Sequence, residues 1–309
     1  MPLYSYFDTH CDTLLKIYKE EKSIFDRNLQ VNYKALSHFE KSVQCFCLFN
    51  DGSLSVSDYI DAAYVLKKEC DKSGMLFCTT SSDIEKAVSG GKVGAVLCAE
   101  AIGNTSDFSE KQLYVLKKCG YSMIGFVWNF DNLLCGGCMG SDTGLTDIGF
   151  KTLKTMEKLA IIPDVSHMSQ RSFYDVCNNF CKSIVASHSN CKKICKHNRN
   201  LTDDQIIKII LSGGCVGLSF YPPFVGGEIS DFSFLEKHIS HILSLGGEHN
   251  ICLGSDFDGI DETVIGLENS VGVESFMRFL IGKKYPKKLV NDISFNNIYN
   301  IFKKYEILK

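Results

Sequence analysis

Residues 146–167 read TDIGFKTLKTMEKLAIIPDVSH, a stretch in which a helical pattern passes directly into a strand pattern. Its first part places apolar residues at helical spacing, and Thr146 can cap the N-terminus of the resulting helix. The apolar residues that share roughly one face of this helix are Ile148, Leu153, Met156 and Leu159. The apolar run at 160–165 then predicts a buried strand. The stretch therefore predicts a helix that leads into a buried strand with polar residues at its carboxyl end.

The same alternation of strand patterns and amphipathic helical patterns extends along the chain. Strands are predicted at 3–8, 43–49, 93–99, 122–128, 160–165, 183–186, 215–220 and 250–254, with a side strand at 75–79. Continuous apolar strands joined by helices indicate a parallel sheet covered on both faces. Eight such units predict a closed (β/α)8 barrel of the TIM type. An open doubly wound sheet is the alternative, but no glycine-rich phosphate loop follows the first strand.

Length and composition agree with one large domain. The chain has 309 residues, of which 45% are hydrophobic and 22% charged, so a sizeable core can be buried. We expect residues 1–309 to form a single barrel domain with additional helices at its C-terminal end. The net charge of −3 and the absence of a clustered basic face argue against a nucleic-acid partner.

The expected location is the cytoplasm. The first residues show no signal-peptide pattern, and no apolar run approaches the roughly 18 residues of a membrane span. The fifteen cysteines are then expected to be free, mostly buried thiols. Cys135 and Cys138 form a CGGC and Cys45 and Cys47 a CFC, but neither has a second cysteine pair at zinc-ribbon spacing.

Polar residues gather where five of the predicted strands end. The stretches are FDTHCD (7–12), CAEAIG (98–103), DVSH (164–167), SHS (187–189) and GSDFDG (254–259). In an α/β barrel the carboxyl ends of all strands meet at one mouth, where catalytic groups lie. The side chains expected to converge there are His10, Asp12, Glu100, His167, His188 and Asp256. Each motif alone is weak evidence, but the combination at correct strand ends is specific.

These residue types predict a centre for two divalent metal ions. His10 and Asp12 point to the same side because side chains on a strand alternate. Imidazole and carboxylate ligands suit zinc and similar ions. Two such ions repel each other and need a shared anion, for which Glu100 is the best-placed carboxylate. Asp256 could hold or deprotonate the water that the metals acidify, so the pattern predicts a metal-dependent hydrolase.

The motifs resemble those of the membrane (renal) dipeptidase family of zinc metallopeptidases. The matching stretches are DTHCD, AEAIG, GLTDIGFKTLKTMEKLAIIPDVSHMS, SIVASHSNCKKICKHNRNLTD and NICLGSDFDG, in the family order. The later NDISFNNIYNIF is similar to the closing helix of that family. Because the chain is shorter than the animal enzymes and lacks their signal and anchor segments, it resembles a soluble, bacterial-type member.

The resemblance implies a function and a role for each site residue. It implies hydrolysis of dipeptides, including those with a C-terminal D-residue, by two zinc ions per chain. His10, Asp12 and Glu100 would bind one ion, and Glu100, His167 and His188 the other. Asp256 would assist the bridging water, Tyr221 would line the pocket, and Arg199 would bind the substrate carboxylate. Arg199 is one of only four arginines in a lysine-rich chain. The family also suggests a homodimer.

One position departs from the family pattern. Animal members carry a histidine after the fourth strand that contacts the reacting carbonyl, whereas this chain reads FVWNFDN, with Trp128 in that place. Indole can donate one hydrogen bond but cannot carry a proton or a positive charge. We expect Trp128 and the following Asn129 to lie at the substrate.

Two other functions remain open at this point. One is a barrel amidohydrolase acting on a cyclic amide or ester, and the other is a metal-containing binding protein without catalysis. Arg199 favours the dipeptidase over the first, because a free carboxylate suits a bidentate cation. The complete ligand set with Asp256 argues against the second.

Overall fold

The computed structural model describes residues 4–227 and 229–307, and within them eight parallel strands close into a barrel. The barrel strands are β1 (Ser5–Asp8), β2 (Lys41–Phe49), β4 (Val93–Glu100), β5 (Tyr121–Gly125), β6 (Ile162–Asp164), β7 (Val185–Ala186), β8 (Cys215–Leu218) and β9 (Ile251–Leu253). Their spatial order is β2-β1-β9-β8-β7-β6-β5-β4, and β2 pairs with β4 from Ser42↔Val93 to Phe49↔Glu100. This last pairing closes the barrel, confirms the predicted fold and rules out the open sheet.

A ninth strand, β3 (Leu76–Cys78), lies outside the barrel. It pairs with the first half of β4, whereas β5 pairs with the second half. The predicted side strand is therefore confirmed.

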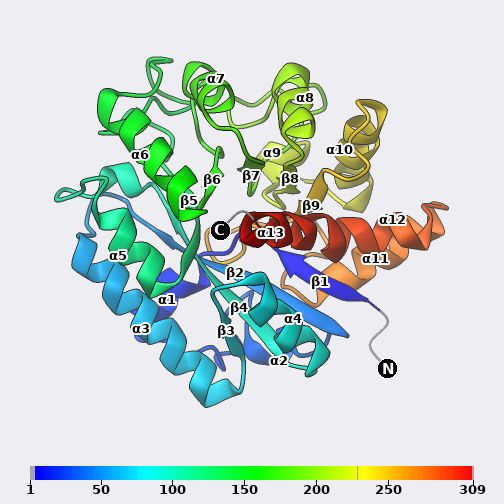
Figure 1. Ribbon diagram of the computed structural model, residues 1–309. Helices are drawn as coiled ribbons and strands as arrows, with labels where there is room; N and C mark the ends of the chain where they lie inside the picture. Colours follow the sequence, from blue (N-terminus) through cyan, green and yellow to red (C-terminus); the bar gives the residue numbers. More distant parts are fainter. Residues whose placement is uncertain (1–3, 228, 308–309) are drawn as a thin grey trace.

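Helices surround the strands, as Figure 1 shows for α3 to α10. The longer helices are α1 (Thr13–Lys19), α3 (Val56–Ser73), α4 (Ser81–Ser89), α5 (Gln112–Cys119), α6 (Asp147–Leu159), α7 (Gln170–Asn179), α8 (Asp203–Ser212), α10 (Phe232–Ser244), α11 (Gly272–Gly282) and α13 (Asn297–Ile307). Shorter segments are α2 (Tyr33–Leu36), α9 (Pro222–Val225), α12 (Lys287–Asn291), a 3₁₀ turn η1 (Ile102–Asn104) and a π-helical turn η2 (Asp292–Asn296). At the end of the chain η2 and α13 pack against β1, where the ring of Phe7 lies on those of Phe295 and Phe302.

Several predicted strands are too long at their ends, for local reasons. Ala160 has a left-handed conformation (φ 50°) at the end of α6, so β6 begins at Ile162 rather than at Ala160. After Gly125 the carbonyl of Phe126 accepts hydrogen bonds from the backbone N–H of Gly103 and the side chain of Asn132, so residues 126–128 leave the ladder. The strands predicted at 183–186, 215–220 and 250–254 are likewise shortened to β7, β8 and β9. Leu3, the predicted start of the first strand, lies outside the described residues.

The helix predicted from residue 146 onward forms as expected. The side chain of Thr146 accepts a hydrogen bond from the backbone N–H of Gly149 and caps α6. Leu153 and Met156 are buried against the barrel, whereas Ile148 and Leu159 are only partly buried. The helix is thus amphipathic, with a narrower buried face than the sequence predicts.

Candidate metal centre and active site

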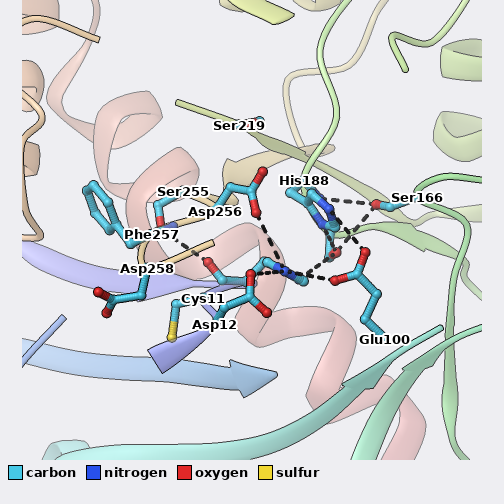
Figure 2. A network of polar contacts seen from close by, with 12 residues as sticks. Cys11, Asp12, Glu100, Ser166, His188, Ser219, Ser255, Asp256, Phe257 and Asp258 are labelled. Atoms are coloured by element: carbon cyan, nitrogen blue, oxygen red, sulfur yellow. Dashed lines mark hydrogen bonds and ion pairs between the residues drawn. The ribbon is translucent and has the colours of Figure 1, made fainter. Parts of the chain in front are cut away.

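The six polar residues predicted to converge do lie together at the carboxyl end of the barrel. Glu100 is the last residue of β4, and the other five follow the ends of β1, β6, β7 and β9. Each is at least nine-tenths buried. Figure 2 shows the carboxylates of Asp12, Glu100 and Asp256 turned toward the same space as the ring of His188. Asp258 points away from this space, and its carboxylate binds the hydroxyl of Thr13 and the backbone of Gln30 instead.

One group of side chains surrounds His10. Its Nε2 lies 3.6 Å from Oδ2 of Asp12, 3.4 Å from Oε2 of Glu100 and 3.8 Å from Oδ1 of Asp256. The imidazole therefore has three carboxylates around one nitrogen. Oxygen and nitrogen donors at this spacing suit a divalent ion such as zinc.

A second group forms on the other side of Glu100. Nε2 of His167 lies 2.8 Å from Oε1 of Glu100 and 2.9 Å from Nε2 of His188. Nε2 of His188 lies 3.8 Å from the same oxygen. Glu100 thus presents one oxygen to His10 and the other to the two remaining histidines, which is the arrangement expected of a bridging carboxylate.

The hydrogen bonds at Nδ1 of His167 and His188 leave the Nε2 atoms of these two rings without protons. Nδ1 of His167 lies 2.9 Å from Oδ1 of Asn129, which can only accept. Nδ1 of His188 lies 2.7 Å from the hydroxyl of Ser187, which itself donates to Asp164. Both rings therefore donate through Nδ1, and two Nε2 lone pairs face each other. A cation relieves such a contact, so the donor set fits a metal ion.

Buried polar atoms without hydrogen-bond partners also indicate a metal site. Within the described residues, Nε2 of His10, Oδ1 of Asp12 and Oε1 of Glu100 are buried without a hydrogen-bond partner. Buried polar atoms without partners are rare and costly in folded proteins. Their concentration at this point is what a site that holds metal ions requires.

Two buried aspartates support the site from below, and sequence analysis assigned them no role. Asp8 accepts hydrogen bonds from the backbone N–H of His10 and from the backbone and hydroxyl of Ser255. Asp164 accepts from the backbone N–H groups of Ser166 and Ser187 and from the Ser187 hydroxyl. Both belong to quoted motifs, FDTHCD and DVSH, and a charged residue inside an apolar strand was the available signal.

The backbone at the strand ends is held in unusual conformations. His167 and Asp256 have φ angles of 64° and 69°, in the left-handed region that residues with side chains rarely occupy. Gly217 and Gly254 pack so closely that a Cβ on either would collide with the carbonyl oxygen of Ser187. Strained conformations persist only where the surroundings enforce them, and here they aim side chains into the site.

The environment separates the pKa values of the acidic groups. Burial opposes ionisation of Glu100, but His167 and His10 outweigh it and hold the pKa of Glu100 well below its usual range. Burial raises the pKa of Asp256 to about 7; the charges of Asp12 and Glu100 add to this rise, whereas His10 and Arg199 oppose it. Burial also lowers the pKa of His167 to about 4. Glu100 is therefore a stable anion, whereas Asp256 can exchange a proton near neutral pH.

A cavity of about 980 Å³ opens directly above these groups. Three of the residues predicted to meet substrate, Trp128, Asn129 and Tyr221, line it together with the candidate metal ligands. No sequence pattern predicted the other wall residues, which include the apolar and charged side chains of Leu15, Lys16, Lys19, Phe49, Asp51, Phe224, Ile260, Asp261 and Glu262. They come from α1, the end of β2, α9 and the loops that follow β2 and β9, and no strand pattern predicts that these segments meet.

The whole chain matches one protein family. The family model for membrane dipeptidases, peptidase family M19, matches residues 3–309. The chain belongs to the membrane dipeptidase family. It is a metal-dependent dipeptidase, a hydrolase of peptide bonds.

Individual proteins resemble this membrane dipeptidase family member to different degrees. An uncharacterised Klebsiella pneumoniae protein encoded in the pqqA 5′ region is 32% identical over 241 residues, which are 73% of this chain and 87% of that protein. A Rhodobacter sphaeroides metallopeptidase, solved with a phosphinate mimic of L-Ala-D-Ala, is 19% identical with a TM-score of 0.87 and covers 98% of this chain and 99% of its own. The dipeptidase AC, also of family M19, is 20% identical with a TM-score of 0.88 and covers 98% of both chains. At these identities the two structures show that the fold is shared.

In this family member Trp128 stands at the rim of the cavity. The residue is 38% exposed, and its ring packs edge-to-face with that of Phe49, with ring centroids 5.5 Å apart. The centroid of the His167 ring is 6.3 Å away. Trp128 therefore closes one side of the cavity as a large apolar wall.

Arg199 lies behind the candidate metal ligand His188. It is 3% exposed and donates from Nη1 to the hydroxyl of Ser189, at 2.8 Å, and from Nη2 to the carbonyl of His188, at 2.7 Å. It lines a smaller neighbouring cavity of about 190 Å³, which shares the wall formed by His167, rather than the large one. Asp203 pairs with His241 and Asp204 with Tyr174, so the two aspartates on α8 are engaged elsewhere.

The remaining chain features concern cysteines and membranes. All fifteen cysteines lie within the described residues, and every one is a free thiol. Cys135 is buried, while the sulfur of Cys138 lies 3.7 Å from Oδ1 of Asn129. Among residues 4–227 and 229–307, no helix is long and apolar enough to cross a membrane.

Proposed function

We propose that this dipeptidase cleaves dipeptides, including those with a C-terminal D-residue, with a water activated by two divalent metal ions. His10, Asp12 and Glu100 would hold one ion, and Glu100, His167 and His188 the other. Zinc is the expected metal, because the donors are imidazole nitrogens and carboxylate oxygens. The observation that carries the proposal is the position of Glu100, whose two oxygens face the two groups separately.

When bound, the two ions would acidify a water and polarise the carbonyl of the scissile bond. Asp256 supplies the proton transfers. Its carboxylate takes a proton from the attacking water and donates it to the nitrogen of the leaving amine. A pKa of about 7 suits both steps, because an acid–base catalyst works best when its pKa lies near the working pH.

The substrate would lie in the large cavity with its carboxylate directed past the shared wall at His167 toward Arg199, which lines the neighbouring cavity. Support comes from the buried Nε of Arg199, which has no hydrogen-bond partner among the described residues. Tyr221 and Trp128 line this cavity together with the candidate metal ligands. The Rhodobacter sphaeroides metallopeptidase was solved with a phosphinate mimic of L-Ala-D-Ala, a dipeptide with a C-terminal D-residue, which supports the inclusion of such dipeptides here.

The proposal includes a homodimer in the cytoplasm. The free state of all fifteen cysteines suits a reducing compartment. The homodimer rests on the family resemblance, and sedimentation of the purified protein tests it.

A dipeptide panel with variants of Arg199 tests the substrate class. We expect metal-loaded enzyme to cleave L,L and L,D dipeptides and to cleave dipeptide amides poorly. A bidentate, charge-assisted contact to the carboxylate would contribute about 2–4 kcal/mol to transition-state binding. The value of kcat/KM should therefore fall from Arg199 to Arg199→Lys to Arg199→Met, by about 30- to 1000-fold in all.

The amide separates this role from a structural one, because Arg199 also braces the carbonyl of His188. If Arg199 binds the carboxylate, Arg199→Met should hardly change the rate on the amide. Equal losses on the dipeptide and its amide would reject the carboxylate role and favour an amidohydrolase acting on other amides or esters.

A further inference from the structure

The side chain of Asn129 lies against the candidate metal ligand His167, on the side of the ring remote from the metal centre. Oδ1 of Asn129 is 2.9 Å from Nδ1 of His167. The other ring nitrogen, Nε2, faces Glu100 at 2.8 Å and His188 at 2.9 Å. One end of the imidazole is therefore held by the amide while the other points into the site.

This contact determines which ring nitrogen carries the proton. A neutral imidazole has one N–H group, and a carbonyl oxygen can only accept, so the proton lies on Nδ1. Nε2 is then left with its lone pair toward the metal centre. With the opposite tautomer an N–H group on Nε2 would face His188 and no lone pair would be available to a metal ion.

Asn129 is itself held firmly. Its φ angle of 30° is rare for a residue with a side chain. Its carbonyl oxygen accepts a hydrogen bond of 2.7 Å from the backbone N–H of Met139, and a Cβ at Gly137 would collide with that same carbonyl oxygen. Holding such a conformation costs free energy, which contacts with the surrounding loop must offset. The loop of residues 126–139 thus places one amide oxygen in a defined position.

The orientation of the His167 ring depends on a single side chain, whereas that of His188 has a charged group behind its partner. Nδ1 of His188 uses Ser187, which is backed by the buried carboxylate of Asp164. Among the described residues, Nδ1 of His167 has a hydrogen-bond contact with Asn129 alone, and no charged group stands behind that amide oxygen. Removal of Asn129 should therefore affect one side of the metal centre.

We propose that Asn129 is a positioning residue for His167: its amide oxygen holds Nδ1–H and directs the Nε2 lone pair at the metal ion. This assigns the amide oxygen to the protein and leaves only the amide NH2 group for a substrate. The inference rests on the proposed binuclear centre.

Zinc binding by metal-free protein tests the proposal, with a competing chromophoric chelator as the reporter. Asn129→Leu removes the oxygen that accepts from Nδ1–H of His167. Asn129→Asp keeps such an oxygen, because both oxygens of a carboxylate accept hydrogen bonds. We expect Asn129→Leu to weaken one of the two zinc sites by about 10- to 100-fold and to leave the other within a few-fold. Asn129→Asp should bind both ions at least as tightly as the unmodified protein. Asn179→Leu, at an exposed asparagine on α7, is the matched control.

A second readout does not depend on metal affinity. In protein labelled with 15N-histidine, the Nδ1–H proton of His167 should be protected from exchange, and Asn129→Leu should abolish that signal while Asn129→Asp retains it. If Asn129→Leu does not fold, as judged by circular dichroism, Asn129→Ala replaces it, since it removes the amide without adding bulk.

The outcomes separate this inference from the proposed function. Failure of the unmodified protein to bind two zinc ions overturns both. Two tight sites in the unmodified protein and in Asn129→Leu overturn the positioning role alone. Equal weakening of both sites, or equal loss in the Leu and Asp variants, also overturns it, because a general structural defect would produce either result.

Discussion

The β1–β9 side of the site and its β6–β7 side are supported by the same pair of residue types, a buried aspartate and a serine that follows another strand. Asp8 binds Ser255, which precedes Asp256, and Asp164 binds Ser187, which precedes His188. In both cases the aspartate also holds backbone N–H groups of the turn that carries the functional residue. The carboxyl ends of neighbouring parallel strands lie side by side, so one buried carboxylate can hold two of them.

The two sides differ in what the serine does next. The hydroxyl of Ser187 lies 2.7 Å from the ring nitrogen Nδ1 of His188 and so determines the tautomer of a candidate metal ligand. The hydroxyl of Ser255 contacts Asp8 and the backbone carbonyl of His10, and leaves the carboxylate of Asp256 free toward the cavity. Under the proposed function, the β6–β7 side would orient lone pairs for a metal ion, while the β1–β9 side would keep a carboxyl group available for proton transfer.

The strongest test of this comparison removes the residue that both sides share. Glu100→Gln keeps the shape of the side chain but loses the charge that faces His10 and His167. We expect both zinc sites to weaken and kcat/KM to fall by about 1000-fold or more, which corresponds to about 4 kcal/mol. Elemental analysis after dialysis, together with dipeptide hydrolysis, measures the change. Glu85→Gln, at an exposed residue on α4, is the control. If Glu100→Gln still binds two zinc ions tightly, Glu100 is not the carboxylate that the two ions share.

The two serines provide a matched pair of smaller changes. Ser187→Ala should weaken zinc on the His167–His188 side by about 10- to 100-fold, because an imidazole loses its orienting partner. Ser255→Ala should leave both zinc affinities nearly unchanged and lower kcat, because the turn that carries Asp256 loses its support. Chelator competition and initial rates at saturating zinc distinguish the two patterns. If both variants lose zinc equally, or both lose only kcat, the proposed division between the sides is wrong.

A buried histidine outside both sides should leave zinc binding unchanged and gives a reference for acid sensitivity. Nε2 of His238 donates to the carbonyl of Val225 at 2.7 Å, and its Nδ1 accepts from the backbone N–H of Cys191 at 3.0 Å. Burial lowers the pKa of His238 to about 4. An unfolded histidine binds its proton near pH 6.5, so the contribution is complete above that pH and is lost as the pH falls toward 4. The full difference is on the order of 3 kcal/mol.

Urea unfolding of metal-free protein between pH 7 and pH 4 measures this contribution. His238→Gln should be less stable than the unmodified protein at pH 7, but its stability should fall less steeply on acidification. Zinc affinity should be the same in both proteins at pH 7. Parallel pH profiles would show that His238 does not titrate differently in the folded state, and that acid sensitivity comes from the carboxylates of the site.

The sequence by itself determined the barrel and the set of residues that meet at its mouth. Both follow from local patterns, because alternating strands and helices with polar residues at strand ends restrict the topology to few arrangements. The patterns could even separate a helix start from a strand start, since Thr146 caps α6 as its hydroxyl predicts. They could not give the strand ends, because Ala160 and Phe126 leave regular structure for reasons that involve neighbouring segments.

Only the tertiary structure decided how the site residues are held and which groups face the cavity. Asp8 and Asp164 acquire their roles from Ser255 and Ser187, which are far away in the sequence. Likewise, Oδ1 of Asn129 meets His167 across 38 positions, and Arg199 comes to lie behind His188 rather than on the wall of the large cavity. Periodicity reports which face of an element is buried, but hydrogen bonds between loops depend on distances that only the closed barrel sets.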